Sequence, residues 1–73
     1  MVDKYIQNEA TFGMNAGKVW QALSLLGEAG FVMLKDETEL TLEEVHGALG
    51  WLAREGKIIQ IDDGTALKFK LNE

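Results

Sequence analysis

The sequence has no cysteine and no proline, and its basic side chains are outnumbered by acidic ones. Without disulfides, a domain of 73 residues depends on a well-packed core or on a partner subunit for its stability. No apolar run approaches the roughly 20 residues that span a bilayer. The first residues also lack the apolar stretch of a secretory signal, so we expect a cytoplasmic protein. Hydrophobic residues nevertheless make up 47% of the chain, and this content excludes an intrinsically disordered protein.

Residues that carry most enzyme chemistry are scarce as well. The serine Ser24 lies inside an expected helix, and the chain has one histidine, His46. Glu43, one turn before His46, adds a second metal ligand at most, whereas zinc sites use three or four protein ligands. The glycine-containing stretch 13–17 lacks the lysine-threonine ending of a phosphate-binding loop. The sequence therefore predicts no catalytic residue, no metal, no cofactor and no small-molecule substrate, and hence no enzyme.

Negative charge is concentrated in one part of the chain. The formal net charge is −5, from 7 basic and 12 acidic side chains. The two flanking parts, residues 1–35 and 57–73, are each neutral. The whole excess therefore lies in residues 36–56, where Arg54 is the only base and the acids are Asp36, Glu37, Glu39, Glu43, Glu44 and Glu55. Such a segment repels phosphates, so the charge argues against conventional nucleic-acid binding.

Two helices are expected in the first half of the chain. Residues 15–28 have helical periodicity, with Asn15 as the N-cap and with Gly27 and Gly30 ending the helix. The apolar stripe of this helix consists of Ala16, Val19, Trp20, Leu23 and Leu26. A brief extended segment at residues 31–32 and a two-turn helix at residues 33–39 are expected to follow.

The third expected helix has the clearest signals. Thr41 and Glu44 have the spacing of a capping box, in which each satisfies a free backbone N–H group. Gly56 supplies the left-handed residue at which the helix ends. Its apolar stripe consists of Leu42, Val45, Ala48, Leu49 and Leu52.

A β-hairpin is expected after this helix, because the hydrophobic period changes from 3.6 to 2. One register has a two-residue turn and pairs Asp62 with Thr65. The other has a three-residue loop with Gly64 in a bulge and pairs Ile61 with Thr65. We favour the second register because it collects the apolar residues on one face, namely Ile59, Ile61, Leu67, Phe69 and Leu71.

This order of elements predicts an α+β fold, the winged helix-turn-helix, with a three-helix core followed by a C-terminal hairpin wing. We expect the domain to span residues 14–73, after an N-terminal arm of residues 1–13. Two stretches support the same assignment, NAGKVWQAL at 15–23 and ALGWLAREGKI at 48–58. They resemble a family of small bacterial and archaeal winged helix-turn-helix proteins whose domain has no known function. The resemblance covers residues 14–71 and implies the fold, but it brings no functional residues with it.

Trp51 is the most informative residue of the third helix. On a helical wheel it falls nearly opposite the apolar stripe, on the side of Gly47 and Gly50. Each of these glycines costs about 1 kcal/mol relative to alanine, so we expect that side to need space for a neighbour. In one account, Tyr5, Ile6 and Phe12 of the N-terminal arm cover Trp51. In the other, Trp51 anchors a partner protein or a second copy.

These observations lead to two hypotheses of function. The first is a non-catalytic interaction or regulatory module, a homodimer or a binder of a partner protein. It uses the outward apolar and glycine positions, namely Trp51, Gly47, Gly50, Leu25 and Ile58. The alternative is a DNA-binding, transcription-regulator-like protein that uses the wing and the end of the third helix. The basic side chains that would contact the DNA are Arg54, Lys57, Lys68 and Lys70.

Overall fold

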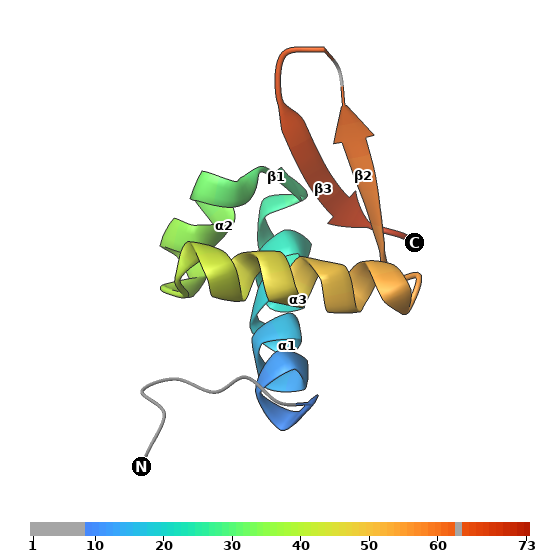
Figure 1. The fold of residues 1–73 in the computed structure, drawn as a ribbon. Coiled ribbons are helices and arrows are strands. Elements are labelled where there is room, and N and C mark those ends of the chain that lie inside the picture. Colours follow the sequence, from blue (N-terminus) through green and yellow to red (C-terminus); the bar gives the residue numbers. More distant parts are fainter. Residues whose placement is uncertain (1–8, 63) are drawn as a thin grey trace.

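The computed structural model describes residues 9–62 and 64–73, which form three helices and a three-stranded antiparallel sheet. In chain order the elements are α1 (Glu9–Leu26), β1 (Glu28–Ala29), α2 (Phe31–Thr38), α3 (Leu42–Arg54), β2 (Ile58–Asp62) and β3 (Leu67–Leu71). Figure 1 shows α3 crossing α1, with α2 beside them and the β2–β3 hairpin projecting from the helices as a wing. This arrangement confirms the winged helix-turn-helix prediction.

The first helix begins earlier than expected. It starts at Glu9, so residues 9–13 belong to the domain rather than to an arm, and residues 1–8 lie outside the described part of the chain. Asn15 is not an N-cap, because it lies inside α1 with 2% of its surface exposed. Its Nδ2 group has no hydrogen-bond partner among the described residues. A second prediction about this helix is also wrong, since Trp20 is exposed rather than part of the buried stripe.

The ends of the helices follow their sequence signals closely. Thr41 Oγ1 accepts a hydrogen bond from the Glu44 backbone N–H (3.1 Å), and Glu44 Oε1 accepts one from the Thr41 N–H (2.8 Å). The predicted capping box is therefore confirmed. Gly27 and Gly56 have φ angles of 84° and 71°, in the left-handed region where glycine carries no Cβ penalty. Both helix ends placed at these glycines are thus confirmed.

The capping box provides a direct test of how much local structure contributes to stability. Replacing Thr41 with alanine removes the acceptor for the Glu44 N–H and is expected to lower the free energy of unfolding by about 1 kcal/mol. Urea denaturation followed by circular dichroism measures this loss. Thr41→Ser keeps the hydroxyl and is the matched control. Equal stability of the alanine and serine variants would contradict the assignment of the cap.

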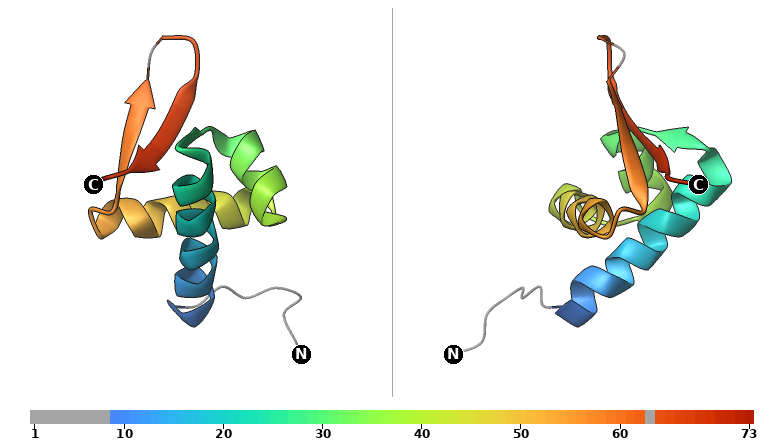
Figure 2. Two further views of the ribbon diagram at one scale, coloured as in Figure 1. Left: turned by 180° about the vertical axis from the view of Figure 1, so that it is seen from behind. Right: turned by 90° about the vertical axis from the view of Figure 1, so that its right-hand side faces the viewer.

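The segment between α1 and α2 differs in detail from the prediction. The extended residues are Glu28 and Ala29, which form β1, and α2 begins at Phe31 rather than at residue 33. Ala29 pairs with Phe69 of β3, so the sheet has three strands instead of the two of a simple hairpin. Phe31 contacts the Phe69 ring edge-on (5.2 Å between centroids), which ties α2 to the inner face of the sheet. Figure 2 shows this sheet from two further directions.

Both predicted hairpin registers are wrong. The structure pairs Asp62 with Leu67 and Ile61 with Lys68, so residues 63–66 connect the two strands. Cross-strand partners share a face, so this register places Ile58 with Phe69 on the inner face and Ile59 with Lys70 on the outer one. The expected outward position of Ile58 is therefore wrong, because its side chain is buried in the core. It also follows that Ile59 and Ile61 do not share a face with Leu67, Phe69 and Leu71.

The core lies where the three helices and the inner face of the sheet meet. Among the described residues, thirteen apolar side chains are buried in it. They are Ala16, Val19, Ala22, Leu23, Ala29, Leu34, Leu40, Val45, Ala48, Leu49, Leu52, Ile58 and Phe69. In α3 the predicted stripe is confirmed except for Leu42, which is exposed. None of the helices in residues 9–62 and 64–73 has the length and the hydropathy of a membrane-spanning segment.

Candidate interaction surface

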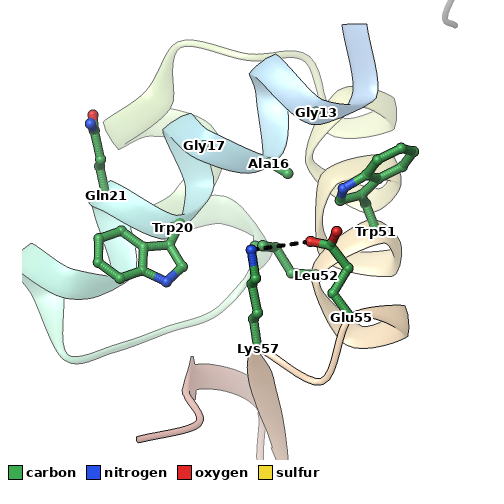
Figure 3. A pocket seen from close by; sticks show the side chains of 9 residues that line it. All are labelled: Gly13, Ala16, Gly17, Trp20, Gln21, Trp51, Leu52, Glu55 and Lys57. Carbon is green, nitrogen blue, oxygen red and sulfur yellow. Dashed lines mark ion pairs between the residues drawn. The ribbon is translucent and has the colours of Figure 1, made fainter. Parts of the chain in front are cut away.

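The most distinctive surface feature is a hollow between α1 and the C-terminal end of α3. We call it the tryptophan groove and define it by its lining residues, Gly13, Ala16, Gly17, Trp20, Gln21, Trp51, Leu52, Glu55 and Lys57. Its volume is about 380 Å³. Figure 3 shows the two indoles on opposite sides of the groove, Trp20 from α1 and Trp51 from α3. Two tryptophans that face one open hollow give this surface the amphipathic aromatic character of a binding site.

The spacing of α1 explains the shape of one wall. Gly13, Gly17 and Trp20 are separated by four and three residues, so they lie along one side of the helix. Beyond its immediate neighbours in the helix, a Cβ atom placed on Gly13 or on Gly17 would meet no atom of residues 9–62 and 64–73 within 4 Å. The absence of side chains at these two positions therefore keeps the groove open beside Trp20, whose exposed fraction is 40%.

Trp51 forms the opposite wall and is less exposed than its position on the helical wheel indicates. Its side chain is half-buried and packs against the edge of the core. The indole also stacks on the Phe12 ring, with 6.1 Å between centroids and an interplanar angle of 5°. The intramolecular account of Trp51 is thus confirmed for Phe12, which belongs to α1, whereas Tyr5 and Ile6 lie outside the described residues.

A second hollow lies on the other side of Trp51. It is lined by Glu9, Phe12, Gly47, Gly50, Trp51 and Arg54. A Cβ atom on Gly50 would meet no atom within 4 Å, so no described residue of this chain fills the space that this glycine leaves. The predicted residues Trp51, Gly47 and Gly50 are thus brought together, with Trp51 shared between the two hollows.

Two other predicted interface residues lie elsewhere. Leu25 is 73% exposed but lines a different hollow, between α1 and α2, together with Lys18 and Glu37. Ile58 is in the core, as described above. Sequence reasoning missed Trp20, because its spacing from Val19 and Leu23 placed it in the apolar stripe. The repeat of Gly13, Gly17 and Trp20 along one side of α1 is the signal that identifies it.

The basic residues proposed for nucleic acid lie in different surroundings. Lys68 and Lys70 lie on the outer face of β3, the face away from Phe69 and the helical core. Lys57 Nζ lies 3.5 Å from Glu55 Oε1, so its charge is offset at the rim of the tryptophan groove (Figure 3). Arg54 instead borders the second hollow, beside Glu9 and Trp51.

The exposed surface of the helix-turn-helix pair is acidic. Asp36, Glu37 and Glu39 of the α2 region and Glu43 at the start of α3 are all exposed. The surface that reads DNA in this fold therefore has the sign of charge that disfavours a duplex.

His46 is exposed on α3, and its ring contacts Phe31 edge-on at 4.4 Å. Within the described parts of the chain, no three histidine or acidic side chains are placed to hold a metal ion.

Comparison with known proteins agrees with the fold. No curated protein matches the chain. The solution NMR structure of protein BT2368 from Bacteroides thetaiotaomicron is similar, with 31% sequence identity and a TM-score of 0.82. The match covers 89% of this chain and 79% of that one. The family model of the winged helix-turn-helix domain DUF2582 matches residues 5–71. The chain therefore belongs to the DUF2582 family of winged helix-turn-helix domains.

Proposed function

We propose that this domain is a non-catalytic regulatory module that recognises another protein through the tryptophan groove. The observation that carries the proposal is the pair of tryptophans, Trp20 and Trp51, on opposite sides of a hollow kept open by Gly13 and Gly17. Tryptophan is enriched among the residues that dominate binding energy at protein interfaces. An indole that is 40% exposed beside an open groove has apolar surface left for a partner to cover.

Charge favours a protein partner over a nucleic acid. The acidic side chains of α2 and of the start of α3 occupy the surface that a DNA major groove would meet. Lys68 and Lys70 point away from the helical core, so a duplex laid along α3 gains little from them. Their shared face on the wing nevertheless makes wing-mediated nucleic-acid binding the competing candidate, with Arg54 and Lys57 as its further contacts.

Trp20→Ala is the variant that tests this proposal most cleanly. Trp51 contacts Phe12 and the core, so its removal also affects folding, whereas Trp20 is exposed. We expect Trp20→Ala to weaken binding of the partner at least 30-fold, the size of a hot-spot residue. Stability should change by less than about 1 kcal/mol. The partner is first captured with the wild-type chain, and its affinity is then measured by isothermal titration calorimetry with both purified proteins.

The matched control is Met33→Ala, which removes an exposed apolar side chain from α2, outside the groove. It should leave the affinity unchanged. Equal losses in the two variants would show that the groove is not the recognition surface. Binding of random duplex DNA that falls steeply with salt, and that is lost in a Lys68→Ala/Lys70→Ala variant, would favour the wing instead.

A further inference from the structure

The wing has an open edge that the tryptophan groove does not involve. The strand order is β1-β3-β2, so within the described part of the chain β2 has a neighbour on one side only. Open edges pair readily with other strands, and proteins usually guard them with lysine, proline or a bulge. The strand Ile-Ile-Gln-Ile-Asp has none of these, and its one charge is at its end, on Asp62. Figure 1 shows this strand at the outer side of the wing.

The hydrogen bonds to β3 identify which backbone groups of β2 point to the open edge. The Asn72 N–H donates to the Lys57 carbonyl at 2.9 Å. Bonded positions in an antiparallel ladder recur at every second residue, so Ile59 and Ile61 also direct their backbone groups towards β3. The N–H and C=O groups of Ile58, Gln60 and Asp62 consequently point away from the sheet.

We propose that two copies of this chain pair through their β2 strands, antiparallel, about a twofold axis at Gln60. Gln60 then lies opposite the Gln60 of the second copy, and Ile58 lies opposite its Asp62. Each of these residues donates and accepts one backbone hydrogen bond across the edge, so the outward-pointing groups of β2 are all satisfied. The result is a continuous sheet across the two wings.

The side chains of β2 select this register. Ile59 is 39% exposed on the outer face, and Ile61 is half-buried there. In the register centred on Gln60, Ile59 of each copy lies opposite Ile61 of the other. These are non-hydrogen-bonded pairs, in which side chains approach most closely. If one β2 strand is shifted by two residues along the other, Ile61 of each copy lies opposite Lys57 of the second copy. If it is shifted by two residues the other way, Ile59 of each copy lies opposite the turn of the second copy. The centred register alone pairs both isoleucines.

The lysines of the wing do not oppose this pairing. Within one copy, Lys70 of β3 is the cross-strand partner of Ile59 of β2, and Lys68 is the partner of Ile61. In the paired sheet, Lys68 of one copy is three strand spacings from Lys70 of the other, about 14 Å. This exceeds the screening length of about 8 Å at physiological salt. One short strand from each copy buries less surface than a standard interface, so we expect a weak, concentration-dependent dimer.

Dilution of the full chain tests the pairing by NMR and sedimentation velocity. At roughly 1 mM we expect dimers, and at roughly 10 µM monomers, as for a small interface. On dimerisation, amide exchange should slow at Ile58, Gln60 and Asp62 while Ile59 and Ile61 stay unchanged. That alternation is specific to edge pairing, because the latter two amides already face β3. A wild-type chain that remains monomeric at the higher concentration would overturn the proposal.

Two variants separate edge pairing from other interfaces. Gln60→Pro removes an N–H that makes no bond to β3 and should abolish the dimer, whereas Gln60→Ala keeps the N–H and the dimer. Ile59→Lys should also give a monomer, with unchanged helical signals. Trp20→Ala should leave this dimer intact, so its outcome is independent of the proposed recognition groove. A dimer that persists in Gln60→Pro and shifts the Trp51 signals would place the twofold contact on α3 and overturn the assignment to β2.

Discussion

Replacing Leu34 with alanine is expected to destabilise the domain by about 2–5 kcal/mol. The Leu34 side chain has no exposed surface and is the buried apolar residue of α2, where it joins the core formed with α1 and α3. Its removal leaves a cavity in addition to the lost burial. A domain of this size and without disulfides has only a few kcal/mol of net stability, so a large fraction of the variant should be unfolded near physiological temperature.

Thermal unfolding followed by circular dichroism measures this effect. We expect the Tm to fall by at least about 10 °C, because 1 kcal/mol corresponds to about 4–8 °C in a domain of 60–100 residues. Met33→Ala is the control, since it removes a side chain of similar size from the exposed side of the same helix. A Leu34→Ala variant that melts within about 2 °C of the wild type would show that α2 does not depend on this contact.

The features that could be predicted from the sequence are those determined by neighbouring residues. Thr41 and Glu44 are three residues apart, and the capping box that they form needs nothing from the rest of the chain. The same holds for the helix ends at Gly27 and Gly56, where the backbone φ is positive. These local signals, together with the apolar stripe of α3, were sufficient to predict the winged helix-turn-helix order.

The hairpin register could not be predicted, because distant contacts determine it. Ile58 follows α3 by a few residues and is drawn into the core, and Phe69 is held there by Phe31 and Ala29. These two contacts set the faces of β2 and β3 independently of the turn. Gathering every apolar residue on one face therefore gave the wrong answer, and Ile59 remains on the outer face.

The candidate site was predicted on one side only. Trp51 and Gly50 were identified because an outward-facing tryptophan and glycines inside a helix are both energetically unfavourable in α3. The opposite wall was missed, since the spacing of Trp20 is equally compatible with the buried stripe and with the exposed row of Gly13 and Gly17. Which of these two sides faces the core depends on how α3 crosses α1, and that crossing is a property of the packed domain (Figure 2).

Replacing Gly13, Gly17 and Gly50 together with alanine is expected to raise the stability of the domain by about 3 kcal/mol. Each is a glycine inside a helix and costs about 1 kcal/mol relative to alanine. A Cβ atom at any of them would meet no atom of the described residues within 4 Å beyond its immediate helix neighbours, so the new methyl groups clash with none of those residues. At about 4–8 °C per kcal/mol, the Tm should rise by roughly 12–24 °C in a thermal melt. Gly27→Ala is the control, because its positive φ should make that variant less stable.

The same triple variant should lose partner binding although its fold is more stable. Its methyl groups narrow the tryptophan groove at the α1 wall and fill part of the hollow on the other side of Trp51, where we propose that the partner approaches closely. We therefore expect stability and affinity to move in opposite directions, as they do where a binding surface is maintained at the expense of stability. Titration calorimetry with the purified partner and a thermal melt on the same sample measure both quantities. If affinity is retained together with the higher Tm, the space at these glycines is not used for recognition, and the proposed surface is wrong.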